Sequence, residues 1–181
     1  MSGQVSAYSV LQALAKKSLS NAQQLPAQID TVEQWSGIGF SVLGFDFVIP
    51  MQELAEMLEI PPYTRLPSVH DWVKGVSNVR GRLLPLFDLA AFYSGSLSGH
   101  KKKQRLLVLD NSSVYAGLWV DRVFGMQYFD ASSKVATVDM ALPSRLGDFV
   151  NGYYEQDGRR WMVFSSQVLS QDASFLNVAV N

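Results

Sequence analysis

Residues 73–87 read VKGVSNVRGRLLPLF, and residues 150–164 read VNGYYEQDGRRWMVF. The two stretches align without a gap at an offset of 77 residues. Each carries two glycines six residues apart and then an apolar run, which is the pattern of a β-hairpin whose turn requires positive φ. A repeat of this kind indicates the duplication of one ancestral unit. The matching positions are Val73/Val150, Gly75/Gly152, Gly81/Gly158, Arg82/Arg159, Leu86/Val163 and Phe87/Phe164.

Short apolar runs punctuated by glycine and turn residues continue through most of the chain after residue 36. Such runs predict many short strands, which favours small β-barrels over a sheet built from βαβ units. Residues 51–58, MQELAEML, are ambiguous, because their propensities are helical while their alternation suits a strand. The strands expected are 38–43, 45–49, 75–79, 82–87, 105–109, 114–120, 122–128, 152–154 and 159–164.

The first 36 residues differ in texture from the rest. Apolar residues recur there at three- and four-residue spacing, which predicts an amphipathic helix that ends before Pro26. A polar connector over 26–33 follows. Two roles for the helix remain open: it packs on the main domain as a cap, or it docks a partner. The apolar stripe consists of Tyr8, Leu11, Leu14, Ala15 and Leu19.

Composition limits the classes of function. The chain has 181 residues, no cysteine and a formal net charge of −1, so neither disulfides nor an electrostatic attraction to nucleic acid or anionic membrane is expected. No apolar run reaches the length of a membrane span, and the N-terminus lacks the pattern of a secretory signal. A cytoplasmic globular protein without membrane insertion is predicted.

No catalytic or cofactor-binding motif is visible. The two histidines, His70 and His100, lack metal-ligand spacing, and there is neither a Gly-x-Ser-x-Gly elbow nor a phosphate loop. We therefore expect no enzymatic activity, no metal and no cofactor. Two alternatives remain: a hydrolase with an unrecognised catalytic pair, and a β-barrel that binds a small ligand or nucleic acid. Lys101–Lys103 and the aromatic Tyr153, Tyr154 and Trp161 favour the latter.

Four motifs carry a resemblance to a known family. They are TRLP at 64–67, GVSNVRG at 75–81, PLFDL at 85–89 and GLWVDRV at 117–123. In this order, over about residues 37–170, they resemble the signature of CheW-like domains, with Val79 where leucine is usual. Within the family, the N-terminal helix and the phrases WSGIGF (35–40) and VRGRLLP (79–85) are most similar to the adaptors of type IV pilus twitching-motility systems.

This resemblance implies a mainly β fold of two SH3-like five-stranded barrels around a shared apolar core, with an added N-terminal amphipathic helix. The implied divisions are 1–36 for the helix and connector, 37–170 for the CheW-like domain and 171–181 for a C-terminal tail. The sub-barrels would span about 37–104 and 105–170, with exchange of strands between them left open. The resemblance also favours strand over helix for residues 51–58.

The resemblance further implies a non-catalytic adaptor that is monomeric when isolated and is recruited to receptor arrays at the inner membrane. Its partners would be the cytoplasmic tip of a methyl-accepting chemoreceptor and the regulatory domain of a CheA-like histidine kinase. The receptor would be bound by helix-in-groove recognition. The kinase would be bound through a heterologous, ring-forming contact.

Residue roles carry over position by position. A salt bridge between Glu56 and Arg80 is implied, although Arg80 could equally be purely structural. Leu54 and Met57 correspond to apolar receptor contacts, with barrel core as the open alternative. The implied receptor-binding set is Leu54, Met57, Gly75, Asn78 and Arg80. The implied kinase-binding set is Val120, Val123, Phe124 and Met126.

Overall fold

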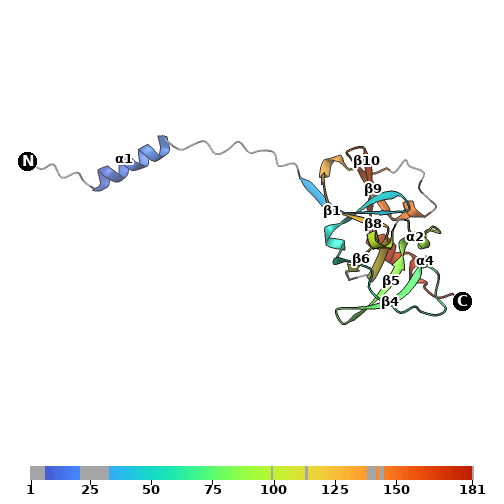
Figure 1. Ribbon diagram of the computed structural model, residues 1–181. Helices are drawn as coiled ribbons and strands as arrows, with labels where there is room; N and C mark the ends of the chain where they lie inside the picture. The colour runs from blue at the N-terminus through green and yellow to red at the C-terminus, as the bar shows by residue number, and fades with distance from the viewer. Residues whose placement is uncertain are drawn as a thin grey trace, which may run out of the picture. The chain divides into compact units, whose positions relative to one another are not determined.

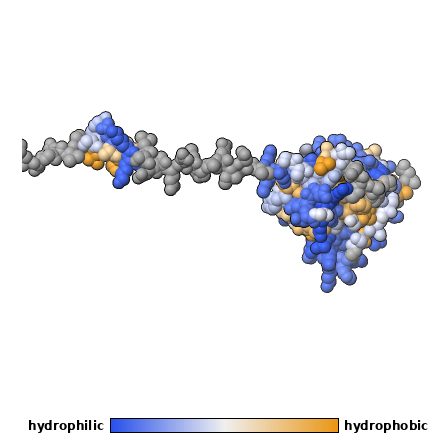
Figure 2. Space-filling model, turned by 90° about the horizontal axis from the view of Figure 1, so that it is seen from above, coloured by the Kyte–Doolittle hydropathy of each residue, from blue (hydrophilic) through white to orange (hydrophobic). Residues whose placement is uncertain are grey.

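The computed structural model describes residues 7–20, 33–98, 100–112, 114–137, 142 and 145–180. The chain divides into two units, residues 1–32 and 33–181. The first contains the expected helix, α1 (Ala7–Ser20). Apolar side chains gather on one side of α1 and polar side chains on the other (Figure 2). No described helix is long and apolar enough to cross a membrane.

The second unit is built on two five-stranded sheets, which confirms the mainly β prediction. The first sheet has the order β8-β1-β2-β10-β9 and the second has the order β3-β6-β7-β5-β4. The strands of the first are β1 (Gln34–Val42), β2 (Phe45–Pro50), β8 (Arg122–Asp130), β9 (Val150–Gln156) and β10 (Arg159–Phe164). Those of the second are β3 (Glu56–Leu58), β4 (Val73–Val79), β5 (Arg82–Asp88), β6 (Arg105–Asp110) and β7 (Tyr115–Val120).

The two repeats exchange strands, so the sheets do not divide the chain at residues 104 and 105. Strands β1 and β2 pair with β8 and β10 from the second repeat, as Figure 1 shows, while β6 and β7 pair with β3 and β5 from the first. The sheets nevertheless have equivalent strand orders if β1–β5 are equated with β6–β10. Exchange places side chains of both repeats in each sheet, and thereby joins them around one core.

Both hairpins of the repeat form as predicted, and both use the same turn. Arg80 and Gly81 have φ of 53° and 84°, and Asp157 and Gly158 have φ of 52° and 72°. Two successive residues with positive φ are the requirement of a type I′ turn, whose twist matches that of the flanking strands. The second glycine of each repeat therefore serves the turn.

The first glycine of each repeat serves a close approach of backbone. A Cβ on Gly75 would lie 2.0 Å from the Thr64 carbonyl oxygen, and one on Gly152 would lie 2.4 Å from that of Val135. At both sites the next residue makes an isolated antiparallel bridge to the approaching segment, Thr64 to Val76 and Val135 to Tyr153. The segment that follows β3 thereby contacts β4, and the segment that follows β8 contacts β9. Because these strands are the two edges of each sheet, the bridges close each sheet toward a barrel.

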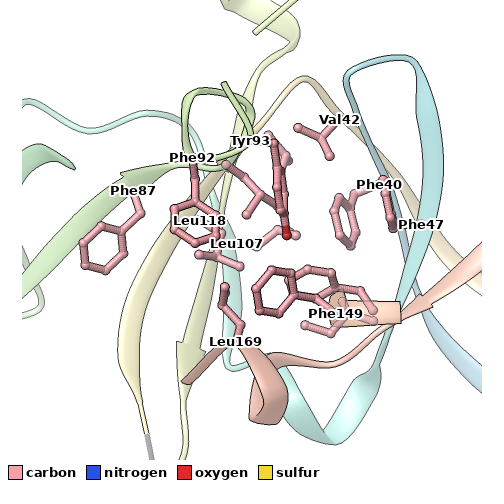
Figure 3. Close-up of a cluster of buried hydrophobic side chains, with 14 of the residues drawn as sticks. Phe40, Val42, Phe47, Phe87, Phe92, Tyr93, Leu107, Leu118, Phe149 and Leu169 are labelled. Atoms are coloured by element: carbon pink, nitrogen blue, oxygen red, sulfur yellow. The ribbon is translucent and has the colours of Figure 1, made fainter. Parts of the chain in front are cut away.

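One large apolar core lies between the sheets. It combines Phe40 and Phe47 of the first sheet with Leu107 and Leu118 of the second, and Figure 3 shows these side chains converging. Short helical segments cover it: α2 (Leu89–Phe92), η4 (Leu146–Phe149), α3 (Ser166–Gln171) and α4 (Ala173–Leu176). The hydroxyl of Tyr93 is buried in this region without a hydrogen-bond partner, and burial raises the pKa of that phenol.

The ambiguous stretch 51–58 contains two elements, so the strand expectation holds only for its last part. Met51–Glu53 form a 3-10 turn, η1, and the strand β3 is limited to Glu56–Leu58. The Glu53 carboxylate accepts hydrogen bonds from the backbone N–H and the hydroxyl of Ser166, at 2.8 and 2.7 Å. This anchorage to the start of α3 holds η1 away from the sheet.

The C-terminal residues belong to the folded unit and do not form a separate tail. Phe175 is buried, with its ring centroid 4.8 Å from that of Phe87 and 5.7 Å from that of Trp72. Beyond it, Ala179 makes an antiparallel bridge to Val69. Apolar residues beyond the expected boundary at residue 171 therefore take part in the core.

Candidate partner-binding surface

A groove lies between the edge strand β3 of the second sheet and the edge strand β8 of the first. Its volume is about 500 Å³. We call it the inter-sheet groove and define it by its lining residues, which are the apolar Met57, Leu58 and Val123, the acidic Glu59 and the basic Lys102, Lys103, Arg105 and Arg122. The groove thus has an apolar part and a strongly basic part.

Met57 contributes to the apolar part of the groove because successive side chains of the three-residue strand β3 point in opposite directions. In β3, Glu56, Met57 and Leu58 lie opposite Val108, Leu107 and Leu106 of β6. Leu58 packs against the apolar cluster of the second barrel, so Met57 points the other way and is 44% exposed. An unbranched, adaptable thioether side chain at this place suits an apolar partner surface.

The Arg80 guanidinium and the Glu56 carboxylate form an ion pair of 2.6 Å beside Met57. The side chain of Arg80 is 79% exposed and that of Glu56 is 22% exposed. The type I′ turn directs Arg80 toward β3, and the Asn78 side-chain oxygen accepts a hydrogen bond from the Gly81 N–H at 2.9 Å. The pair is therefore an exposed contact held in place by an ordered turn.

The residues implied for the receptor contact do not share one exposed face. Met57 and Arg80 are both exposed. Arg80 pairs with Glu56, which is the residue before Met57 in the chain. Leu54 instead packs, half-buried, against the large core, as the core alternative requires. Gly75 is buried beneath Thr64, and Asn78 is engaged in the hairpin turn. Leu54 and Gly75 therefore lie beneath the surface, whereas Asn78 is exposed at the turn.

Of the residues implied for the kinase contact, Val120 is fully buried and cannot touch a partner. Val123 and Phe124 are partly buried, whereas Met126 is 45% exposed. The strand β8 changes register beside Gly125, whose φ is 84°, and such a bulge shifts the alternation of side chains by one residue. The side chains of β8 on either side of the bulge therefore do not follow one continuous alternation.

Tyr128 and Leu83 are among the exposed apolar residues that the sequence interpretation did not single out. Tyr128 is half-exposed on β8, two residues beyond Met126, and Leu83 is largely exposed next to the β4–β5 turn. The alternation Met126-Gln127-Tyr128 ahead of the buried Phe129 carried a signal for Tyr128. No sequence signal marked Leu83 as exposed, because in the run RLLPL at 82–86 either Leu83 or Leu84 could face the core.

The aromatic and basic residues that favoured a nucleic-acid or small-ligand module do not form one surface: the aromatic residues are buried and the lysines are exposed. Tyr153, Tyr154 and Trp161 are all buried, so their rings are not offered to a stacking ligand. Lys101–Lys103 form an exposed 3-10 turn, η2, beside the inter-sheet groove. Within the described ranges, no three histidine, aspartate or glutamate side chains group so that they could hold a metal ion.

The fold and the sequence are those of a CheW-like domain. The family model for this domain matches residues 36–174, so the chain belongs to the CheW-like family, and the resemblance deduced from its motifs is confirmed. The chain is 48% identical over 162 residues to Protein PilI of Pseudomonas aeruginosa, an alignment that covers 88% of each protein.

More distant relatives show the same family relationship. The chain is 31% identical over 96 residues to Chemotaxis protein CheW of Helicobacter pylori, which covers 53% of this chain and 58% of that one. The crystal structure of the scaffolding protein TtCheW from Thermoanaerobacter tengcongensis superposes with a TM-score of 0.68 at 20% identity. That superposition covers 78% of this chain and 96% of the other, and at this identity it establishes the fold.

Proposed function

We propose that this chain is a non-catalytic adaptor that couples a methyl-accepting chemoreceptor to a CheA-like histidine kinase in the chemosensory control of type IV pilus twitching motility. The observation that carries the proposal is its 48% identity to PilI across 88% of both chains. Because the alignment covers 88% of both proteins, it extends across both barrels and is not limited to one of them.

The inter-sheet groove is the proposed receptor site. An amphipathic helix at a receptor tip would seat its apolar residues on Met57 and Val123, which is helix-in-groove recognition. Arg80, held by Glu56, flanks this contact and offers guanidinium donors that the ion pair leaves largely exposed. Leu54 contributes by packing beneath the site.

The outer face of β8, with Met126 and Tyr128, is the proposed kinase site. Both side chains are about half exposed, and aromatic residues and methionine are enriched in protein interfaces. In the described part of the chain, β8 hydrogen-bonds along one edge only, to β1. A CheW-like regulatory domain of the kinase would meet this face in a heterologous contact.

The two proposed sites share the strand β8. Val123 lines the groove, Met126 lies on the outer face, and the bulge at Gly125 separates them. A helix that shifts in the groove therefore displaces a strand whose other residues contact the kinase. Coupling of this kind is a free-energy difference between two states, typically about 1–3 kcal/mol, and requires no chemistry by the adaptor.

Affinity isolation of the tagged full chain from its own host tests the proposal. A methyl-accepting receptor and a CheA-like kinase of the pilus system should copurify, and both should be lost when the isolation is repeated with an unrelated tagged β protein. Recovery of the flagellar kinase and receptor instead would move the chain to another pathway. Recovery of neither class of protein would contradict the adaptor function.

A further inference from the structure

The inter-sheet groove concentrates positive charge in a chain whose formal net charge is −1. Four cationic side chains line it, and Glu59 is the one acidic residue among those that line it. The cations come from separate parts of the sequence, Lys102 and Lys103 from η2, Arg105 from β6 and Arg122 from β8. We call these four residues the basic rim. The fold, and not one run of lysines, assembles it.

The basic rim is fixed to the barrel wall. The Arg105 guanidinium donates to the carbonyl oxygens of Lys102 at 2.7 Å and Gln104 at 2.8 Å. Gln104 is buried, and its side-chain oxygen accepts a hydrogen bond from the Trp119 indole N–H at 3.0 Å. These bonds hold both ends of the turn, so the two lysines are presented from an ordered backbone.

The charges of the rim are only weakly neutralised by the protein itself. Glu59 lies 3.8 Å from Arg105, but its side chain is 87% exposed, so the pair is well solvated. Among the ion pairs of the described residues, neither Lys102 nor Lys103 has a carboxylate partner. The Arg122 guanidinium lies 4.8 Å from the ring centroid of Phe124 and also interacts with the carboxylate of Asp46, which Arg159 shares, so Lys102 and Lys103 are the least neutralised cations of the rim.

The chemistry of the groove selects among anionic partners. A free phosphate would satisfy the cations but would leave the exposed Met57 without an apolar partner. Nucleic acid would require aromatic platforms, and Tyr154 and Trp161 are buried. A helix with carboxylates beside its apolar anchors matches both parts of the groove, and about 500 Å³ accommodates a few side chains from one helical face.

We propose that the basic rim binds acidic side chains on the receptor helix that seats in the groove, and so determines which receptors this adaptor accepts. The inference rests on the function proposed above, and it names a feature that the receptor must carry: carboxylates flanking the apolar residues that contact Met57. Charge pairs of this kind raise the association rate and reject partners with like charge.

Charge reversal on η2 tests the proposal with the full chain and the purified cytoplasmic fragment of its host's methyl-accepting receptor. K102E/K103E should weaken binding about tenfold at about 0.1 M salt, because two exposed contacts become repulsive. The difference should shrink at about 1 M salt, where the screening length falls from about 10 Å to about 3 Å. K102R/K103R, which keeps the charge, and K134E, which changes an exposed lysine remote from the groove in sequence, should bind like the unchanged chain.

The outcomes separate the inference from the function on which it rests. If K102E/K103E and the unchanged chain bind with equal affinity at low salt and have the same melting temperature, the basic rim does not bind the receptor. That result would leave the adaptor function unaffected. A receptor fragment that fails to bind the unchanged chain at either salt concentration would overturn both. Tighter binding to single-stranded DNA than to the receptor fragment, abolished by K102E/K103E, would reassign the rim to nucleic acid.

Discussion

Arg80 Nη2 lies 2.6 Å from Glu56 Oε2, and this contact joins the β4–β5 turn to the strand at the opposite edge of the same sheet. In the order β3-β6-β7-β5-β4, the strands β3 and β4 are the two edges. An ion pair across them shows that the sheet curls far enough to bring its edges together. Glu56 directly precedes Met57 in β3, so this contact adjoins the proposed receptor surface.

The exposure of this pair predicts a small contribution to stability. Arg80→Ala and Glu56→Ala should each lower the free energy of unfolding by about 0–1 kcal/mol, and the double variant should lose less than the sum of the two. Urea denaturation measures all three. Arg82→Ala is a matched control, because Arg82 forms an exposed 2.6 Å pair with Asp110 on the same barrel. Losses of about 3–5 kcal/mol, the cost of breaking a buried pair, would contradict this account.

Leu54 and Met57 should separate stability from binding. Leu54→Ala should lower the free energy of unfolding by about 1–3 kcal/mol, less than a fully buried leucine, because it packs half-buried on the core. Met57→Ala should leave the melting temperature nearly unchanged and weaken receptor association. Thermal unfolding and receptor pull-down of both variants provide the measurement. If Leu54→Ala instead weakened receptor association without lowering stability, Leu54 would belong to the partner surface.

The close approach at Gly75 predicts a large effect of one added methyl group. Gly75→Ala should destabilise the protein by several kcal/mol, because its Cβ would lie 2.0 Å from the Thr64 carbonyl oxygen at a φ of 138°. Gly81→Ala is the control, since its φ is also positive but its Cβ would meet nothing within 4 Å. That variant should lose only about 1–2 kcal/mol. Equal losses in chemical denaturation would show that the bridge to Thr64 is not the constraint.

The assignment of the kinase face to β8 predicts a specific loss of binding. Met126→Glu should weaken association with the kinase regulatory domain at least tenfold, since a buried interface anchor contributes about 1–3 kcal/mol. Val168→Glu places the same charge on a side chain that is also 45% exposed, but on α3, and should bind normally. Calorimetric titration with the kinase regulatory domain measures the affinity of both variants. If Met126→Glu binds as tightly as Val168→Glu, β8 is not part of the kinase contact.

The hairpins were predictable from sequence because their signals are local. Gly75 and Gly81 recur as Gly152 and Gly158 with the same apolar run behind each pair, and the structure uses each pair in the same way. The exchange of strands between the repeats was not predictable in this manner. The pairing of β1 with β8 joins residues more than 80 positions apart, and either repeat presents similar apolar faces for such pairing.

The candidate site was predictable only in part, for a related reason. The family resemblance indicated Met57, Glu56 and Arg80, but the direction in which Leu54 points depends on the 3-10 turn η1, which Glu53 holds through Ser166. The exposure of Met126 depends on a bulge in β8 whose place no local pattern fixes, and Val120 is buried as the last residue of β7. The basic rim also required the fold, because Lys102 and Arg122 belong to different sequence repeats and are brought to one groove only by the fold.

Reconstitution of kinase control tests the central claim most directly. The kinase, the receptor in membranes and the full chain are combined, and the rate of kinase autophosphorylation is measured with each component omitted in turn. The account predicts that the receptor changes this rate only when the chain is present, and that Met57→Ala or Met126→Glu abolishes the change without unfolding the protein. A receptor-dependent rate that is the same with and without the chain would contradict it.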